Sequence, residues 1–107
     1  MQILQLQTTI RTGKDEKDKQ VDALFDGPRR KLVQITLRNH TLLNAHKSDV
    51  PITIQCIAGS GTLTVGDAAE LVELTPGVLV TIDPNVSHEI RANPAVSILL
   101  TQFTDKP

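Results

Sequence analysis

The chain has 107 residues and a formal net charge of -1, from 11 basic and 12 acidic side chains. This length suits one domain with one core. Because the positive and negative charges are nearly equal in number, the protein has no strong overall electrostatic field that would attract nucleic acid or an anionic membrane. The aromatic side chains are two phenylalanines, too few for the base stacking by which proteins bind single strands.

The single cysteine excludes a disulfide within the chain and is typical of a reducing compartment. The first seven residues, Met1 to Gln7, lack the basic start and long apolar run of a signal peptide. The apolar stretches are all shorter than a membrane span. We therefore expect a soluble, cytoplasmic protein with neither nucleic acid nor a membrane as partner.

The N-terminal residues 1–30 are more polar than the rest and are expected to form a segment outside the core. Met1 to Thr9 is assigned as an edge strand, and Gly13 to Gln20 as a solvated loop or one exposed helical turn. The helical spacing of Val21, Leu24 and Phe25 predicts a short helix that ends at Gly27-Pro28.

From Lys31 onward, apolar and polar residues alternate with a period of two, which indicates strands with one buried face. The predicted strands are rich in Val, Ile, Leu and Thr: Lys31 to Arg38, Ile52 to Ile57, Gly61 to Val65, Glu70 to Leu74, Val78 to Ile82, His88 to Arg91 and Val96 to Phe103.

Turn sequences separate these strands at short intervals: Asn39-His40-Thr41, Gly59-Ser60-Gly61, Gly66-Asp67, Thr75-Pro76-Gly77, Asp83-Pro84-Asn85 and Asn93-Pro94. Short strands at such spacing, without a long helix, predict an all-β antiparallel sandwich or barrel over residues 31–107. Ser60 is interpreted as part of a hairpin turn, not as a nucleophile.

Two histidines frame a pair of spaced motifs. The first runs from His46 through Ser48 and Ile52 to Gly59, and the second from Gly77 through Asp83-Pro84-Asn85 to His88. In order and spacing these resemble the two motifs of the cupin family. The resemblance implies a cupin-type antiparallel β-barrel, also called a double-stranded β-helix or jelly roll, of the small single-domain kind.

The resemblance also implies a metal site, which in cupins takes three histidines and one glutamate from these motifs. Here His46 and His88 occupy two of the positions, whereas Ser48 and Ile52 replace the second histidine and the glutamate. Isoleucine has no lone pair and a serine hydroxyl is a poor ligand, so a divalent ion such as Zn, Fe, Mn or Ni would be held only weakly. We therefore expect no cofactor.

Ile52, Ile54 and Cys56 share one face of their strand and are expected to point the same way as His46. Cys56 is either a third metal ligand, as a thiolate, or a small buried hydrophobe, and the second reading is favoured. His40 is assigned to the surface.

The leading hypothesis is a non-catalytic protein whose barrel cavity binds a small molecule, as a sensor or accessory protein. The predicted cavity residues are His46, His88, Ser48, Ile52, Ile54 and Cys56. One alternative is a metal-dependent oxygenase or isomerase using His46 and His88. The other is a structural module that forms a homodimer through sheet edges and the segment Met1 to Thr9.

Overall fold

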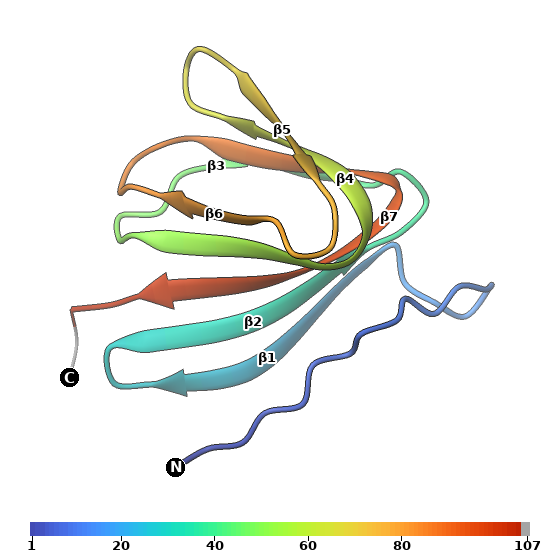
Figure 1. Cartoon of the computed structure of the whole chain (residues 1–107), viewed down its shortest axis with the longest axis horizontal. Coiled ribbons are helices and arrows are strands. Elements are labelled where there is room, and N and C mark those ends of the chain that lie inside the picture. The colour runs from blue at the N-terminus through green and yellow to red at the C-terminus, as the bar shows by residue number, and fades with distance from the viewer. Residues whose placement is uncertain (106–107) are drawn as a thin grey trace.

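The computed structural model describes residues 1–105, in which strands, turns and extended segments occur but no helix. Seven strands form one antiparallel sheet that rolls into a barrel (Figure 1). They are β1 (Lys19–Gly27), β2 (Arg30–Leu37), β3 (Leu42–His46), β4 (Ile52–Val65), β5 (Glu70–Leu74), β6 (Leu79–Ile82) and β7 (His88–Phe103). The predicted all-β barrel is confirmed. Residues 106 and 107, the last two of the given sequence, lie outside the described residues.

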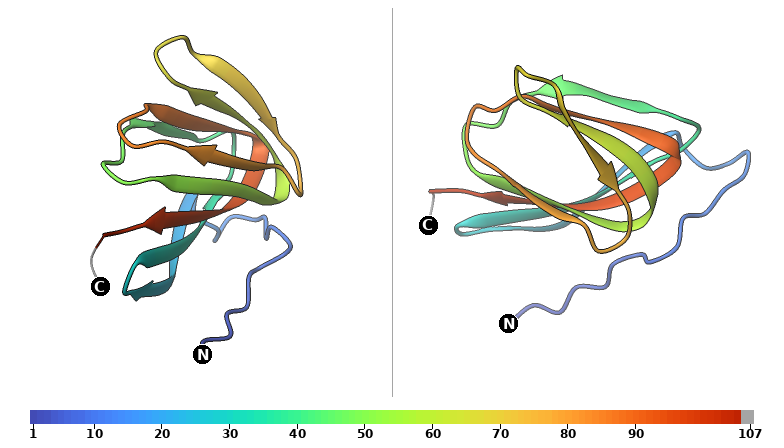
Figure 2. Two further views of the ribbon diagram at one scale, coloured as in Figure 1. Left: turned by 60° about the vertical axis from the view of Figure 1, so that its left-hand side comes forward. Right: turned by 45° about the horizontal axis from the view of Figure 1, so that its top comes forward.

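Two long strands, β4 and β7, form the frame of the barrel and pair with each other along most of their length. Each takes different second partners in its two halves. The first half of β4 pairs with β6 and the second with β5. The first half of β7 pairs with β3 and the second with β2. Both strands therefore bend sharply and carry the sheet around the barrel (Figure 2).

The bend corrects two sequence predictions. Gly59-Ser60-Gly61 is not a hairpin turn but an irregularity inside β4, and Asn93-Pro94 likewise lies inside β7. The residues between Ala92 and Val96 lie opposite Ser60, so both strands leave the ladder together. Bulges bend a strand without ending it and accommodate Gly and Pro. Each pair of predicted strands is thus one continuous strand.

Gly59 shows why the bend needs glycine. Its φ is +75°, and a Cβ at this position would collide with the backbone carbonyl oxygen of Ala95 and approach Cδ1 of Ile10 at 2.8 Å. A left-handed φ and a close backbone approach both favour glycine over any residue with a Cβ.

The predicted helix around Val21 to Phe25 is wrong, because these residues belong to β1, which pairs with β2 from Lys19 to Gly27. A register shift between Ala23 and Phe25 inserts one extra residue into the strand. Val21 pairs with the core residue Ile35, whereas Phe25 lies under the guanidinium of Arg30, 4.4 Å from its ring centroid. The extra residue breaks the two-residue alternation of the strand, so the apolar residues of this segment are spaced as they would be in a helix.

The remaining predicted strands and turns are confirmed within a residue or two, and β3 was not predicted. Asn39 and His40 form a turn with positive φ, as the sequence indicated, and His40 is exposed. The chain then enters β3 at Leu42, which pairs with Arg91 of β7. This short strand carries His46 to the barrel.

The interior of the barrel is aliphatic. Along β4 the buried side chains Ile52, Ile54, Cys56 and Ala58 alternate with half-buried ones, as expected for a strand with one face in a core. Leu37 of β2 and Leu63 of β4 are completely buried. Among residues 1–105 there is no helix of the length and apolarity needed to cross a bilayer.

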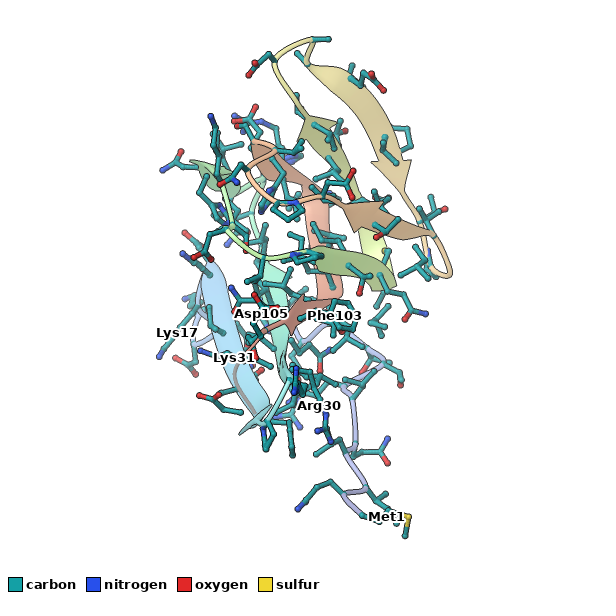
Figure 3. The ribbon with its side chains drawn as sticks, turned by 90° about the vertical axis from the view of Figure 1, so that its left-hand side faces the viewer. Met1, Lys17, Arg30, Lys31, Phe103 and Asp105 are labelled. Carbon is teal, nitrogen blue, oxygen red and sulfur yellow. The ribbon has the colours of Figure 1, made fainter. Side chains whose placement is uncertain are left out.

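The N-terminal segment is not an edge strand, which corrects the prediction for Met1 to Thr9. It runs as an extended chain along the outside of the barrel, with Met1 fully exposed at its tip (Figure 3). Gln34 holds it at Gln7: the side-chain oxygen accepts from the Gln7 N–H at 3.0 Å and the side-chain amide donates to the Gln7 carbonyl at 2.7 Å. The side chain of Gln34 thus forms with the backbone of Gln7 the two hydrogen bonds that a paired strand would otherwise form.

Arg38 fixes the next part of this segment. Its guanidinium, on a residue that is 4% exposed, donates to the carbonyl oxygens of Arg11 at 2.6 Å and Lys17 at 2.9 Å. The carboxylate of Glu16 lies 3.6 Å away. Hydrogen bonds from a charged group are stronger than neutral ones, so we infer that Arg38 is the main anchor of residues 11–17.

Candidate functional site

The two motif histidines meet at one end of the barrel. His46 ends β3 and His88 begins β7, and the two residues are directly paired across these antiparallel strands. His88 is buried, at 2% exposure, whereas His46 is exposed. Their ring centroids lie 4.2 Å apart, with an interplanar angle of 62°. The pairing of β3 with β7 therefore brings together residues that are far apart in the sequence.

The ring nitrogens have well-defined partners. Nδ1 of His46 lies 3.2 Å from the carbonyl oxygen of Asn44, and Nδ1 of His88 lies 3.1 Å from that of Val86. The two Nε2 atoms face each other at 3.1 Å. A carbonyl oxygen can only accept a hydrogen bond, so both Nδ1 atoms must carry the proton for these contacts to form.

A proton count follows from this geometry. Three hydrogen bonds would need three N–H groups, and two neutral imidazoles carry two. If both N–H groups go to the carbonyls, the two Nε2 atoms are acceptors directed at one another. The neutral pair therefore lacks one donor, which a hydrogen-bonding group from outside the pair can supply.

Burial lowers the pKa of His88 below its ordinary value. The Val86 carbonyl acts in the opposite direction by favouring the protonated ring, and the neighbouring charge of His46 lowers the pKa further. Since desolvation is the largest of these effects, we infer that His88 is neutral at physiological pH and that its Nε2 is available as an acceptor.

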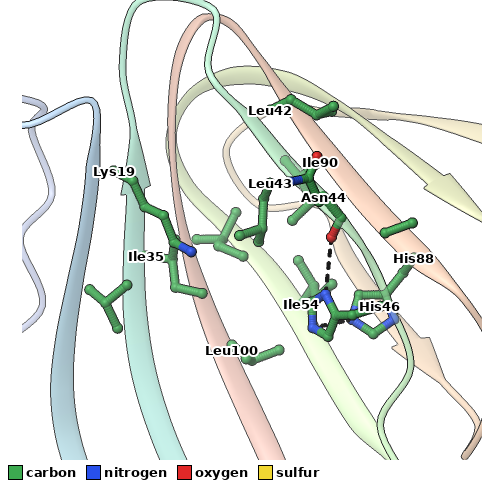
Figure 4. A pocket seen from close by; sticks show the side chains of 13 residues that line it. Lys19, Ile35, Leu42, Leu43, Asn44, His46, Ile54, His88, Ile90 and Leu100 are labelled. Carbon is green, nitrogen blue, oxygen red and sulfur yellow. Dashed lines mark hydrogen bonds between the residues drawn. The ribbon is translucent and has the colours of Figure 1, made fainter.

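A pocket of about 510 Å³ opens beside the pair, and Figure 4 shows both imidazole rings on one side of it. Its walls are mostly aliphatic and come from β1, β2, β3, β4 and β7. The lining residues are Lys19, Val21, Ile35, Leu42, Leu43, Asn44, Ala45, His46, Ile54, His88, Ile90, Ile98 and Leu100. A concave apolar surface with a few convergent polar groups is typical of small-molecule sites.

A second pocket, of about 330 Å³, also borders the histidines and is more polar. It is lined by His46, Lys47, Ser48, Asp49, Ile52, Asn85, His88, Leu100 and Gln102. The two histidines and Leu100 line both pockets. The imidazole pair is thus the boundary between an apolar compartment and a polar one.

The predicted cavity residues are divided between these pockets. Ile54 lines the larger one with both histidines, and Ser48 and Ile52 line the smaller one. Cys56 lines neither. It points into the core, as its strand parity indicated, but lies one step further along β4, where its thiol faces the carbonyl of Ala58 at 3.7 Å.

Burial also raises the pKa of the Cys56 thiol, which favours the protonated form over the thiolate that a metal ligand needs. Together with its distance from both pockets, this supports the reading of Cys56 as a small buried hydrophobe.

The donor set does not fit a tightly held metal ion. The contacts from Nδ1 to carbonyls resemble those that orient metal-binding histidines, but in residues 1–105 no group of three or more His, Cys, Asp or Glu side chains gathers where it could hold an ion. Protein zinc sites take three or four ligands of these kinds. The residues present offer two imidazoles.

The sequence reasoning missed part of the larger pocket because it missed two strands. Lys19 and Val21 lie on β1, and Leu42, Leu43 and Asn44 lie on β3. The alternation of Lys19, Val21 and Ala23 was the signal for β1, but the bulge after Ala23 concealed it.

Comparisons with known proteins support the fold. No protein-family model matches the chain, and no curated protein matches it in sequence. Solved structures do match. An RmlC-like cupin protein from Desulfovibrio desulfuricans superposes with a TM-score of 0.80 at 19% identity, over 96% of this chain and 96% of that chain.

An RmlC-like cupin family protein with a double-stranded β-helix fold, from Methanocaldococcus jannaschii, is also similar, with a TM-score of 0.72 at 21% identity over 92% of each chain. The polyketide cyclase RemF from Streptomyces resistomycificus gives 0.74 at 20% identity, over 85% of this chain and 68% of that chain. At such identities the likeness establishes the fold and no activity.

Proposed function

We propose that this chain, which has the cupin fold, binds a small organic molecule in its barrel without catalysing a reaction. The observation that carries the proposal is the imidazole pair of His46 and His88, whose two Nε2 acceptors converge at the boundary between an apolar pocket and a polar one. A ligand with an apolar body and a hydrogen-bond donor satisfies both features.

In residues 1–105 no other side chain donates a hydrogen bond to either Nε2 atom, so the missing donor would come from the ligand. Both Nδ1 protons are used by backbone carbonyls, and neutral imidazoles carry no others. A hydroxyl group at the pocket boundary would donate to one Nε2 atom. Its apolar body would then contact Ile54 and the other aliphatic walls of the larger pocket, where burial of apolar surface contributes most of the affinity.

A metal-dependent oxygenase or isomerase is the alternative that the fold suggests, but the site does not favour it. Such chemistry needs an ion held with open coordination positions, and the two imidazoles are joined by no third strong donor in residues 1–105. Solved neighbours include an enzyme, yet their low identity transfers no reaction to this chain.

The test compares cyclohexanol with cyclohexanone, two probes of nearly equal shape, of which only the alcohol can donate a hydrogen bond. Backbone amide spectra of labelled protein are recorded during titration with each probe. We expect both probes to shift amide signals of the larger pocket. One hydrogen bond contributes about 1 kcal/mol, so the alcohol should bind about five-fold more tightly.

His46→Phe should reduce this preference, because phenylalanine keeps a ring but removes one of the two Nε2 acceptors and leaves that of His88. His46 is the better position to change, since it is exposed whereas His88 is buried. His40→Phe, at an exposed turn outside both pockets, is the matched control and should keep the preference. Equal affinities of alcohol and ketone would remove the role of the histidines, and no shift with either probe would contradict the binding function itself.

A further inference from the structure

We infer that the ligand of the larger pocket is an organic acid, whose carboxylate pairs with the ammonium group of Lys19. This inference rests on the proposed function and adds the charge of the ligand to it. The evidence is the position of Lys19 in the barrel, the absence of a protein partner for its charge and the composition of the pocket.

Lys19 begins β1 on the inner face of the sheet. It pairs with Leu37, whose side chain is fully buried in the core, and Val21 pairs with the core residue Ile35. Neighbouring strands share the direction of paired side chains, so Lys19 and Val21 lie on the inner face of β1, where both are exposed at the mouth of the pocket. Figure 4 shows Lys19 across the pocket from the two histidines.

No acidic side chain of the pocket balances this charge. The lining contains Lys19 and no Asp or Glu. Within residues 1–105 the single ion pair is that of Arg38 with Glu16, so no carboxylate reaches Lys19 within 4.0 Å. Lys19 therefore gives the pocket a net positive charge at neutral pH.

The nearest candidates for a protein partner are engaged elsewhere or lie on another surface. A separate pocket also borders Lys19 and Val21, and its lining includes Asp15, Glu16 and Asp22. The carboxylate of Asp22 accepts from the side chain of Gln20 at 2.9 Å, and Asp22 pairs with Gln34 on the outer face of the sheet. Glu16 faces Arg38. Asp22 and Glu16 thus interact with Gln20 and Arg38, not with Lys19.

Lys19 and Val21 are both exposed, so the pocket is open to solvent along the edge strand β1. Val21 and Ile35 are aliphatic, and the lysine beside them places a charge at the edge of an apolar wall. A carboxylate at this position would gain an ion pair, while a hydroxyl at the opposite side would reach the histidines. A hydroxy acid with an apolar body matches both ends.

Three probes with one cyclohexyl body separate charge from shape: cyclohexanecarboxylate, cyclohexyl methyl ketone and cyclohexyltrimethylammonium, none of which donates a hydrogen bond to the histidines. Their affinities are measured by amide-signal titration at low ionic strength, where ion pairs are least screened. A partly exposed ion pair contributes up to about 1 kcal/mol. We therefore expect the carboxylate to bind about five-fold more tightly than the ketone, and the ammonium compound more weakly than both.

The matched variants are Lys19→Gln and Lys14→Gln, which remove the same charge from the pocket and from an exposed turn. Lys19→Gln should bring the carboxylate and the ketone to equal affinity, whereas Lys14→Gln should leave the order unchanged. If the three probes bind wild type equally, or if Lys14→Gln acts as Lys19→Gln does, the inference of an acid ligand is overturned and cavity binding stands. If none binds, the proposed function fails as well.

Discussion

Two polar clusters lie on opposite faces of the same sheet and differ in how their hydrogen bonds are satisfied. On the outer face, Gln34 is 1% exposed and bonds both to Gln7 and to the hydroxyl of Ser97. Thr36 shares that hydroxyl at 3.1 Å. On the inner face, the Nε2 atoms of His46 and His88 face each other across 3.1 Å, and both are acceptors when the Nδ1 atoms carry the protons.

This difference in hydrogen bonding indicates that the outer cluster has a structural role and that the imidazole pair is the candidate binding site. In the outer cluster, within residues 1–105, every buried side-chain N and O atom has a hydrogen-bond partner, as is usual for buried polar groups, and the cluster holds the N-terminal segment in place. The inner pair lacks one donor and borders two pockets. A polar group that the fold leaves incomplete, beside a cavity, is a candidate ligand contact.

The largest expected effect on stability comes from the outer face. Arg38→Met leaves the carbonyls of Arg11 and Lys17 without their donor and releases the segment that they belong to. We expect the free energy of unfolding to fall by about 2–3 kcal/mol. Urea unfolding followed by circular dichroism measures it, since the chain has no Trp or Tyr for fluorescence.

Arg91→Met is the control for this substitution. Arg91 is exposed and donates to the carbonyl of His40 at 3.1 Å, so its loss should cost less than about 0.5 kcal/mol. If both variants unfold at the same urea concentration, Arg38 is not the anchor of the N-terminal segment.

A smaller loss is expected for Gln34→Leu, which keeps a side chain of similar size but removes the two bonds to Gln7 and the one to the Ser97 hydroxyl. The expected cost is about 1–2 kcal/mol, together with faster proteolytic cleavage near Gln7. Gln5→Leu should leave both quantities unchanged, because the Gln5 amide is exposed and bonds only to its neighbour Leu6. Equal cleavage rates for the two variants would remove the role of Gln34.

The imidazole pair should make the free energy of unfolding depend on pH. Burial lowers the pKa of His88 in the folded chain, so at mildly acid pH the unfolded chain binds more protons. Stability is then full above the ordinary histidine pKa of about 6.5 and decreases as the pH falls below it. One proton limits the slope to about 1.4 kcal/mol per pH unit.

Thermal unfolding between about pH 5 and pH 8 measures this slope. His88→Gln should remove it, whereas His40→Gln, at an exposed turn, should retain it. A slope that persists in His88→Gln would assign the titration to another group.

The smallest effect is expected from metal ions. With two imidazoles as strong donors, added zinc should bind weakly and raise the melting temperature of wild type little more than that of His46→Ala. Elemental analysis of protein purified without chelators provides the second reading. A stoichiometric ion that His46→Ala eliminates would contradict our account of the donor set.

Much of the fold was accessible from the sequence because strands with one buried face alternate visibly. Ile52, Ile54 and Cys56 are buried in turn along β4, as predicted. The failures share a physical cause. Bulges interrupt the alternation at Ala23 and around Ser60, and local sequence does not distinguish a bulge from a turn or a helical step when Gly or Pro is present.

The site was less accessible, since it depends on contacts between distant strands. The motif spacing indicated that His46 and His88 would meet, but their tautomers depend on the carbonyls of Asn44 and Val86. Lys19 was not predicted as a pocket residue because the start of β1 was interpreted as a polar loop and the rest of it as a short helix. Register, which follows from the whole sheet, determines such positions.

The proposed binding function depends most directly on which ring nitrogens of His46 and His88 carry the protons. Nitrogen spectra of uniformly labelled protein at about pH 8, above the ordinary histidine pKa, report which ring nitrogens carry hydrogen. We predict Nδ1–H on both His46 and His88 and an unprotonated Nε2 on each, with the Nε2 signals moving on addition of cyclohexanol. A proton on either Nε2, with no response to the alcohol, would mean that the pair satisfies itself and is structural.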